Sequence, residues 1–182
     1  MELTTARLRT RDLAYIGVFT ALMAVCSWIS IPTTVPFTLQ TMAVFLAVGI
    51  LGGKRGTVAV LGFILLGAVG APVFAGFTGG PSILLGTTGG YIIGFLFAAL
   101  LMWAMERFLG TGLWVLGVSM ALGLLVCYAF GSVWFMWVYA RTTGAVTLAA
   151  VLGWCVVPFI VPDLVKIGLA LTLTAQLRRH VR

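Results

Sequence analysis

The feature that most constrains this chain is a series of apolar runs that are long enough to cross a lipid bilayer and almost free of charge. Of its 182 residues, 62% are hydrophobic and 8% are charged, whereas about 25% of residues are charged in soluble domains. A water-soluble fold of this size has too little interior to hide so much apolar surface. The sequence therefore predicts an all-α integral membrane protein.

Charged and turn-forming residues divide the chain into six apolar segments. We predict six transmembrane helices in one membrane domain that covers residues 1–182, with approximate spans 13–31, 39–53, 57–71, 86–105, 113–139 and 158–177. A spanning helix needs about 20 residues, so the second and third segments are short. Irregular backbone from the Gly- and Pro-rich outer loops is expected at membrane depth, where it is tolerated when it lines a cavity.

The stretch 145–157 allows an alternative with seven spans, because nothing between Arg141 and Asp163 is charged. This stretch is too short to cross a bilayer. A seventh span would also move the basic C-terminal tail to the outside. We therefore expect a short re-entrant or interfacial helix before the last span.

The distribution of Lys and Arg predicts cytoplasmic N- and C-termini. With six spans, the cytoplasmic side receives nine basic residues and the outer side receives only Arg141, which is a strong positive-inside signal. The first apolar run has no signal-peptide cleavage site, so we expect it to be retained as a span. The nine residues are Arg7, Arg9, Arg11, Lys54, Arg55, Arg107, Arg178, Arg179 and Arg182. These residues are dispersed at the ends of apolar runs and do not predict a nucleic-acid-binding face.

An acid and a base lie three residues apart in the last apolar segment, at Asp163 and Lys166. One central Asp or Lys costs roughly 2.5 to 3.5 kcal/mol in a membrane helix, so ionisable residues there are expected to be functional. Their spacing puts both side chains on one helix face, where they can pair with each other or with a polar ligand. Counting 1.5 Å per residue from the inner end places Asp163 in the outer third of the membrane.

Other segments deliver polar and aromatic side chains to about the same depth. They are Tyr91, Gln40, Trp134 and Phe135. A cluster of an acid, a base, an amide, a phenol and aromatic rings is suited to a small molecule with a polar head and an apolar part. Two other interpretations stay open, an interfacial aromatic belt around Trp134 and a helix-entry role for Gln40.

Residues for enzyme chemistry are sparse. Cys26, Cys127 and Cys155 lack metal-ligand spacing and are expected to be buried small hydrophobic residues. The only histidine is His180 in the basic tail, so we expect neither a catalytic nor a metal site. The chain lacks a G-x-x-x-x-G-K-[ST] motif and should not hydrolyse ATP. The apolar inner half argues against a channel.

Four sequence blocks carry a family resemblance. They are Val-Pro-Phe-Thr-Leu-Gln-Thr at 35–41, Gly-Ala-Pro-Val-Phe at 70–74, Gly-Thr-Thr-Gly-Gly-Tyr at 86–91, and Pro158-Phe159 with Asp163-Leu164 and Lys166. From about Arg11 to its end, the chain resembles the BioY family. BioY proteins are the biotin-specific substrate-binding (S) components of energy-coupling factor (ECF) transporters.

The resemblance implies a six-helix protein of the cytoplasmic membrane that captures biotin from the outer side. Loops between the first and second helices and between the third and fourth would cap the pocket. Asp163 could accept from the ureido N–H groups of biotin, and Lys166 could donate to a carbonyl or neutralise a carboxylate. Biotin is then the transported substrate and no cofactor is expected. The candidate substrate-binding residues are Asp163, Lys166, Tyr91, Gln40, Thr38, Phe74, Phe77, Gly79, Gly80, Thr88, Gly90, Trp134 and Phe135.

The resemblance also implies protein partners, namely a transmembrane coupling subunit and two ATPase subunits. Gly17 and Ala21 form a small-xxx-small pair on the first helix, which we predict to dock the coupling subunit. Packing within the chain is the alternative role for this pair. Self-association into a homo-oligomer stays open, and lipid is the expected surrounding.

Two alternative functions remain at this point. One is an S component for a different vitamin, and the other is a membrane scaffold that does not transport. Ligand binding would separate the scaffold from both carriers, and the identity of the ligand would separate the vitamins.

Overall fold

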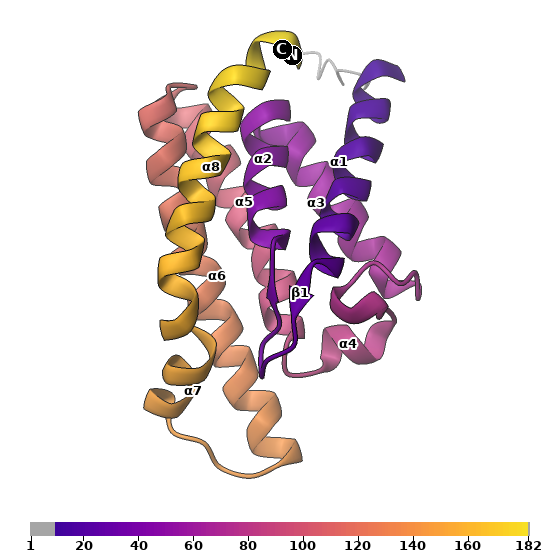
Figure 1. Ribbon diagram of the computed structural model, residues 1–182, viewed down its shortest axis with the longest axis vertical. Helices are drawn as coiled ribbons and strands as arrows, with labels where there is room; N and C mark the ends of the chain where they lie inside the picture. Colours follow the sequence, from indigo (N-terminus) through magenta and orange to yellow (C-terminus); the bar gives the residue numbers. More distant parts are fainter. Residues whose placement is uncertain (1–9, 182) are drawn as a thin grey trace, which may run out of the picture.

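Six long helices run along one axis and form most of the molecule (Figure 1). The structure is a computed structural model that describes residues 10–181, so Arg7, Arg9 and Arg182 lie outside the described residues. The all-α class is confirmed. The long helices are α1 (Thr10–Trp28), α2 (Gln40–Leu51), α3 (Gly53–Ala68), α5 (Gly89–Leu109), α6 (Leu113–Thr142) and α8 (Val157–Val181).

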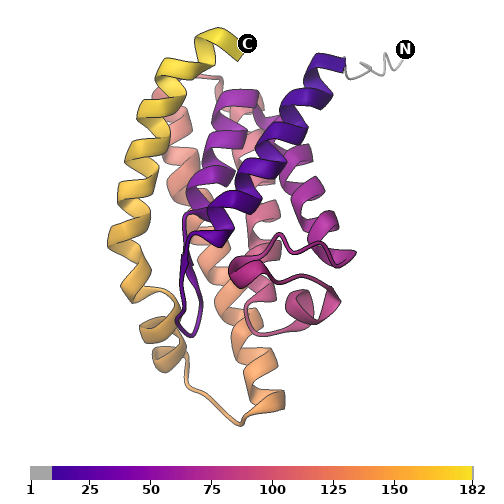
Figure 2. The ribbon, with the colours of Figure 1, turned by 45° about the vertical axis from the view of Figure 1, so that its right-hand side comes forward.

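Short elements cluster toward one end of the bundle (Figure 2). Strands β1 (Ser30–Ile31) and β2 (Phe37–Thr38) pair antiparallel between α1 and α2. The 3₁₀ turn η1 (Ala75–Phe77) and helix α4 (Pro81–Leu85) lie between α3 and α5. Helix α7 (Leu148–Cys155) precedes α8, within the stretch where the sequence predicts a short helix.

Three described helical segments are long and apolar enough to cross a membrane. They are Gly89–Leu109, Leu113–Thr142 and Val157–Arg178, and Gln40–Leu51 is a shorter apolar helix. Every residue of α2 except Met42 is buried, because this short helix lies inside the bundle. The chain is thus a multi-pass membrane protein in which one central helix contacts mostly protein.

Helices α5 and α6 approach each other closely at two glycines. A Cβ atom added to Gly90 would lie 2.3 Å from Cβ of Trp134, and one added to Gly131 would lie 2.2 Å from a ring atom of Tyr91. Neither distance is possible for real atoms, so only glycine permits this approach. The packing places the Tyr91 ring, in the first turn of α5, against Gly131 of α6.

Apart from the buried Asp163 and Lys166, the charged side chains whose contacts are described lie toward the two ends of the bundle. At the end where α1 begins and α8 ends, Arg55 pairs with Asp12 at 3.3 Å, and Arg178 pairs with Glu106 at 3.8 Å. Glu106 also accepts a hydrogen bond from the backbone N–H of Gly53. At the opposite end of α6, the guanidinium of Arg141 lies 3.9 Å from the centre of the Trp137 ring.

Candidate binding site

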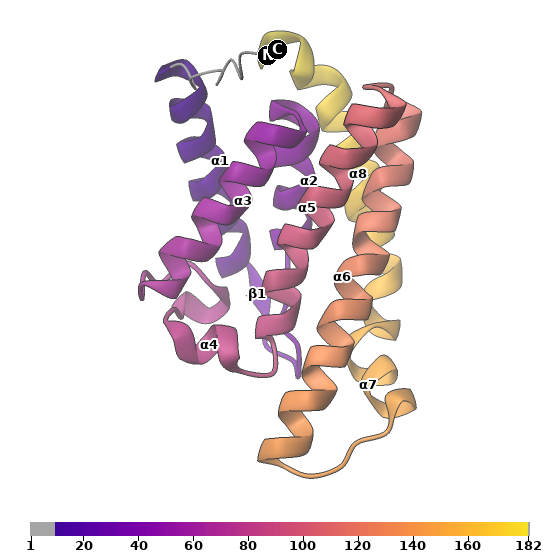
Figure 3. The same ribbon diagram turned by 180° about the vertical axis from the view of Figure 1, so that it is seen from behind.

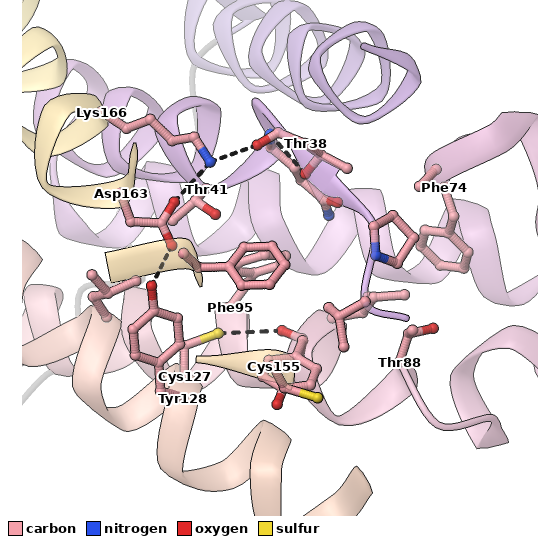
Figure 4. Close-up of a pocket in the computed structure, with 18 of the residues that line it drawn as sticks. Thr38, Thr41, Phe74, Thr88, Phe95, Cys127, Tyr128, Cys155, Asp163 and Lys166 are labelled. Atoms are coloured by element: carbon pink, nitrogen blue, oxygen red, sulfur yellow. Dashed lines mark hydrogen bonds and ion pairs between the residues drawn. The ribbon is translucent and has the colours of Figure 1, made fainter. Parts of the chain in front are cut away.

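A cavity of about 240 Å³ lies among α2, α5, α6 and α8, next to the loops that contain β2 and η1. Its volume is just below the usual range of about 300 to 1,000 Å³ for small-molecule pockets. Figure 4 shows side chains from these elements converging on it. The lining residues are Val35, Pro36, Thr38, Gln40, Thr41, Phe74, Ala75, Thr78, Ile83, Thr88, Tyr91, Ile92, Phe95, Leu124, Cys127, Tyr128, Cys155, Phe159, Asp163 and Lys166.

The charged pair of α8 lies in the wall of this cavity. Lys166 Nζ is 2.7 Å from Asp163 Oδ1, and the two residues are only 4% and 3% exposed. The ammonium group also donates to the backbone oxygen of Thr38 at 2.7 Å and lies 4.1 Å from the centre of the Phe37 ring. Lys166 therefore ties α8 to the loop that precedes α2.

Tyr128 supplies a second partner for the acid. Its hydroxyl donates to Asp163 Oδ2 at 2.6 Å, as the dashed line in Figure 4 shows. Asp163 thus accepts one hydrogen bond on each oxygen, from Lys166 and from Tyr128. Each carboxylate oxygen can accept further bonds, so the group remains open to donors on a ligand.

Gln40 begins α2 at the same cavity. Its backbone N–H donates to Thr38 Oγ1 at 3.2 Å, and the residue is 5% exposed. Within residues 10–181, the buried Nε2 atom of Gln40 has no hydrogen-bond partner. This amide is a donor that lacks an acceptor.

Tyr91 and Thr88 come from the start of α5. The Tyr91 hydroxyl shares a hydrogen bond of 3.2 Å with Ser132 on α6. Thr88 is the residue before the first turn of α5, and it makes no capping hydrogen bond with its side chain. Both residues line the cavity.

Apolar side chains make most of the remaining wall. Phe95 and Phe159 are both buried, and the ring of Phe159 lies 5.9 Å from that of Phe37. A site with one polar region and extensive apolar walls suits a small molecule that also has one polar part and one larger apolar part.

The structure brings seven of the thirteen predicted binding residues together around the cavity. They are Asp163, Lys166, Tyr91, Gln40, Thr38, Phe74 and Thr88. These residues come from both predicted capping loops and from three separate helices. Their depth in the membrane and their contact with a ligand stay predictions.

Three predicted aromatic wall residues lie outside the cavity lining. Trp134 covers Gly90 and donates its Nε1–H to the backbone oxygen of Gly86 at 3.0 Å. Phe135 is buried against Tyr139, with the ring centres 5.5 Å apart. Phe77 is 64% exposed and stacks on Trp28 at 4.9 Å.

The three predicted glycines also lie outside the lining. A Cβ atom at Gly79 would lie 2.2 Å from the backbone oxygen of Ala71, and Gly80 has a positive φ of 98°. Gly90 is packed under Trp134. Gly79 and Gly80 permit the tight path of the loop that carries Phe74, so the structure gives them a role in loop shape.

The predicted docking pair, Gly17 and Ala21, lies on an exposed apolar groove between α1 and α3. A Cβ atom added to Gly17 would have no neighbour within 4 Å among the described residues. Figure 3 shows α1 and α3 side by side on this face. The pair is therefore not needed for close packing inside the chain.

The model of the BioY family matches residues 2–182. The chain belongs to the BioY family. It is 41% identical over 170 residues to the biotin transporter BioY of Thermotoga maritima, an alignment that covers 93% of this chain and 96% of the relative. It is 36% identical to the biotin transporter BioY of Rhodobacter capsulatus, with 92% and 95% of the two chains covered.

A solved structure has the same fold as this BioY chain. It is the S-component for biotin from an ECF-type ABC transporter, with a TM-score of 0.83 and 27% sequence identity. The match covers 97% of this chain and 95% of that chain.

Several residues that line the cavity of this BioY chain are not among the binding residues predicted from the sequence. Tyr128 lies within a long apolar segment and has no charge that would mark it. Cys127 and Cys155 were predicted only as buried small hydrophobic residues. The signal for Tyr128 was its polar tip on an apolar helix, because a buried Tyr hydroxyl usually has a partner. Phe159 belongs to one of the sequence blocks that carry the family resemblance. It lies four residues before Asp163, so helical spacing places it on the same face of the helix and could have predicted it as a lining residue.

Proposed function

We propose that this chain captures biotin from the outer side of the membrane and serves as the S component of an ECF transporter. The observation that carries the proposal is the buried Asp163–Lys166 pair in the wall of a largely apolar cavity. Support comes from the 41% identity to a biotin transporter and from the fold of a biotin S-component.

The chemistry of the cavity matches the parts of biotin. The ureido ring offers N–H donors to the open lone pairs of Asp163, while a carboxylate there would meet like charge. Lys166 has three N–H groups and uses two on Asp163 and the Thr38 oxygen, so the third can donate to the ureido oxygen. Phe95 and Phe159 offer apolar surface to the thiophane ring and the alkyl chain.

The proposed membrane arrangement has six spans, formed by α1, α2, α3, α5, α6 and α8, in one membrane domain. The end with Arg11, Lys54, Arg55 and Arg107 faces the cytoplasm under the positive-inside rule. The cavity then opens toward the outer side, and α7 lies near the outer surface. The membrane is the cytoplasmic membrane, as expected for uptake into the cell.

Energy for uptake comes, in this proposal, from partner subunits. The sequence has no nucleotide-binding motif of the P-loop type. A transmembrane coupling subunit would dock in the groove that contains Gly17 and Ala21, and two ATPases would act through it. Small residues allow the close helix approach that such an interface in lipid requires.

Equilibrium binding of labelled biotin to the detergent-purified chain tests the function. We expect binding that excess thiamine and riboflavin do not displace. The Asp163→Asn variant should bind biotin at least about 10-fold more weakly, because it loses a charge-assisted hydrogen bond. Asp12→Asn, at the opposite end of the molecule, is the matched control.

Two outcomes would contradict the proposal. A well-folded wild-type chain that does not bind biotin would exclude the biotin carrier. Displacement of biotin by thiamine or riboflavin would indicate an S component with a different specificity. If Asp163→Asn kept full affinity while competition behaved as expected, the function would stand and the site assignment would be wrong.

A further inference from the structure

We infer that Trp28, the last residue of α1, holds a lid over the cavity and thereby sets how fast a ligand enters and leaves. The lid is the loop of residues 72–78, which contributes Phe74, Ala75 and Thr78 to the cavity lining. This inference rests on the proposed function for the identity of the ligand. It adds a positioning residue that lies outside the cavity lining.

Trp28 binds both arms of the lid. Its Nε1–H donates to the backbone oxygen of Pro72 at 2.8 Å. Its ring stacks on Phe77, with the ring centres 4.9 Å apart and the planes 24° apart. The preceding residue, Ser27, is buried and donates its hydroxyl hydrogen to the backbone oxygen of Val73. The end of α1 therefore fixes the position of the lid.

Phe77 is held in a strained conformation. Its φ is 57°, and within residues 10–181 it is the only residue other than glycine with a positive φ. Such an angle is an outlier for a bulky side chain, and it persists only where the surroundings impose it. Phe77 is 64% exposed, and its ring stacks on Trp28. The strain favours movement of the lid away from the cavity, and the stack on Trp28 opposes that movement.

Phe74 fixes the base of the lid. Its ring is 1% exposed and meets the buried ring of Phe63 edge-on, with the ring centres 5.5 Å apart. Figure 4 shows Phe74 at the edge of the cavity. Ala75 and Thr78 follow it and line the same cavity. A movement of residues 75–78 about Phe74 therefore opens the cavity and leaves the core in place.

A contact that holds the lid without touching the ligand affects both directions of ligand exchange. Its loss favours the open lid equally in the empty and in the loaded protein, so the ligand enters and leaves faster. The equilibrium affinity changes little, because the contact does not distinguish the two states. A residue that only supports the cavity wall would raise the dissociation rate alone. The two rate constants therefore separate these roles.

The experiment measures the association and dissociation rates of labelled biotin with the isolated chain. Trp28→Ala removes the hydrogen bond and the stack, so both rate constants should rise about 10-fold while Kd stays within about 3-fold. Trp28→Phe keeps a ring for the stack and loses the donor, so its rates should lie between the two. Trp114→Ala removes an exposed Trp in the first turn of α6 and should keep the wild-type rates.

Two variants of Phe77 test the strain and leave Trp28 in place, so they apply even if Trp28→Ala does not fold. Phe77→Ala and Phe77→Gly both remove the ring. Only alanine keeps a Cβ atom, which is unfavourable at a positive φ. Phe77→Gly should therefore exchange biotin about 5-fold more slowly than Phe77→Ala. Equal rates in the two variants would contradict a strained lid.

A second measurement needs no ligand. Cys127 and Cys155 are buried and line the cavity, so a water-soluble methanethiosulfonate reagent should modify them when the lid opens. Mass spectrometry follows the reaction. We expect modification about 10-fold faster in Trp28→Ala than in the wild-type chain, for the same reason as the faster exchange.

Unchanged rate constants and unchanged thiol modification in folded Trp28→Ala would overturn the inference and leave the proposed function intact. A faster dissociation with an unchanged association rate would also overturn it, because Trp28 would then only support the cavity wall. If the wild-type chain did not bind biotin, the proposed function would fail. Thiol modification would then decide whether Trp28 holds the lid.

Discussion

At the scale of single residues, the cavity depends on one continuous chain of hydrogen bonds. Tyr128 donates to Asp163, Lys166 donates to Asp163 and to the Thr38 oxygen, and the chain thereby links α6, α8 and the loop before α2. A buried charge without a partner is costly, and a paired one with satisfied hydrogen bonds is far less so. The same bonds fix the direction in which Asp163 faces the cavity.

Tyr128→Phe tests this positioning role. Removal of the hydroxyl should weaken biotin affinity about 10-fold, because Asp163 loses a hydrogen bond that orients it. Binding of labelled biotin measures the effect. Tyr139→Phe is the control, since Tyr139 lies on the same helix and packs through its ring against Phe135.

A double variant separates positioning from packing. If Tyr128 acts through Asp163, then Tyr128→Phe should cost clearly less affinity in the Asp163→Asn background than in the wild-type chain. Equal losses in both backgrounds would mean that the hydroxyl acts independently of the acid.

The sequence predicted those residues whose burial in lipid carries a large cost. Asp163 and Lys166 could be found because charge in an apolar segment demands a partner. Tyr128 could not be identified in the same way, because an uncharged ring is common in membrane helices. The side-chain surroundings of Trp134 depend on which face of α6 meets α5, and the sequence alone does not determine that face.

At the scale of elements, the contact between α5 and α6 sets the shape of the cavity wall. Gly90→Ala should destabilise the protein by about 1 to 3 kcal/mol, because its new Cβ would overlap Trp134. Thermal unfolding in detergent measures this change. Gly168→Ala, at an open helical position, should be neutral or slightly stabilising. Equal melting temperatures for the two variants would contradict the role given to Gly90.

Helix positions were more predictable than helix ends. The six apolar segments correspond to the six long helices, since the hydrophobic pattern and the charges mark them. The predicted fourth segment, 86–105, differs from Gly89–Leu109 because a tight turn precedes α5 and Gly110 ends it with a φ of 94°. The fold of η1 and α4 depends on local backbone angles and long-range contacts that composition does not encode.

At the scale of the whole molecule, the groove between α1 and α3 is the proposed site for assembly. Gly17→Leu should prevent copurification with the coupling subunit and the ATPases, because the larger side chain fills the groove. Biotin binding by the isolated chain should be unchanged. Val18→Leu changes an exposed neighbour on α1 outside the groove and is the control.

If Gly17→Leu lost both biotin binding and complex formation, this position would instead support the fold. An intact complex would place the coupling subunit on another face. The open surroundings of Gly17 argue for an effect on assembly alone.

The balance of charge in the cavity has an electrical consequence. Asp163 and Lys166 are the only charged residues in the described lining, and their charges cancel. Binding of a ligand with one carboxylate therefore gives the loaded site a net charge of −1. Moving that charge into a cell with a negative interior costs about 2.3 kcal/mol per 100 mV. Under the proposed function, we therefore expect uptake of such an anion through this neutral site to be electrogenic and opposed by the membrane potential.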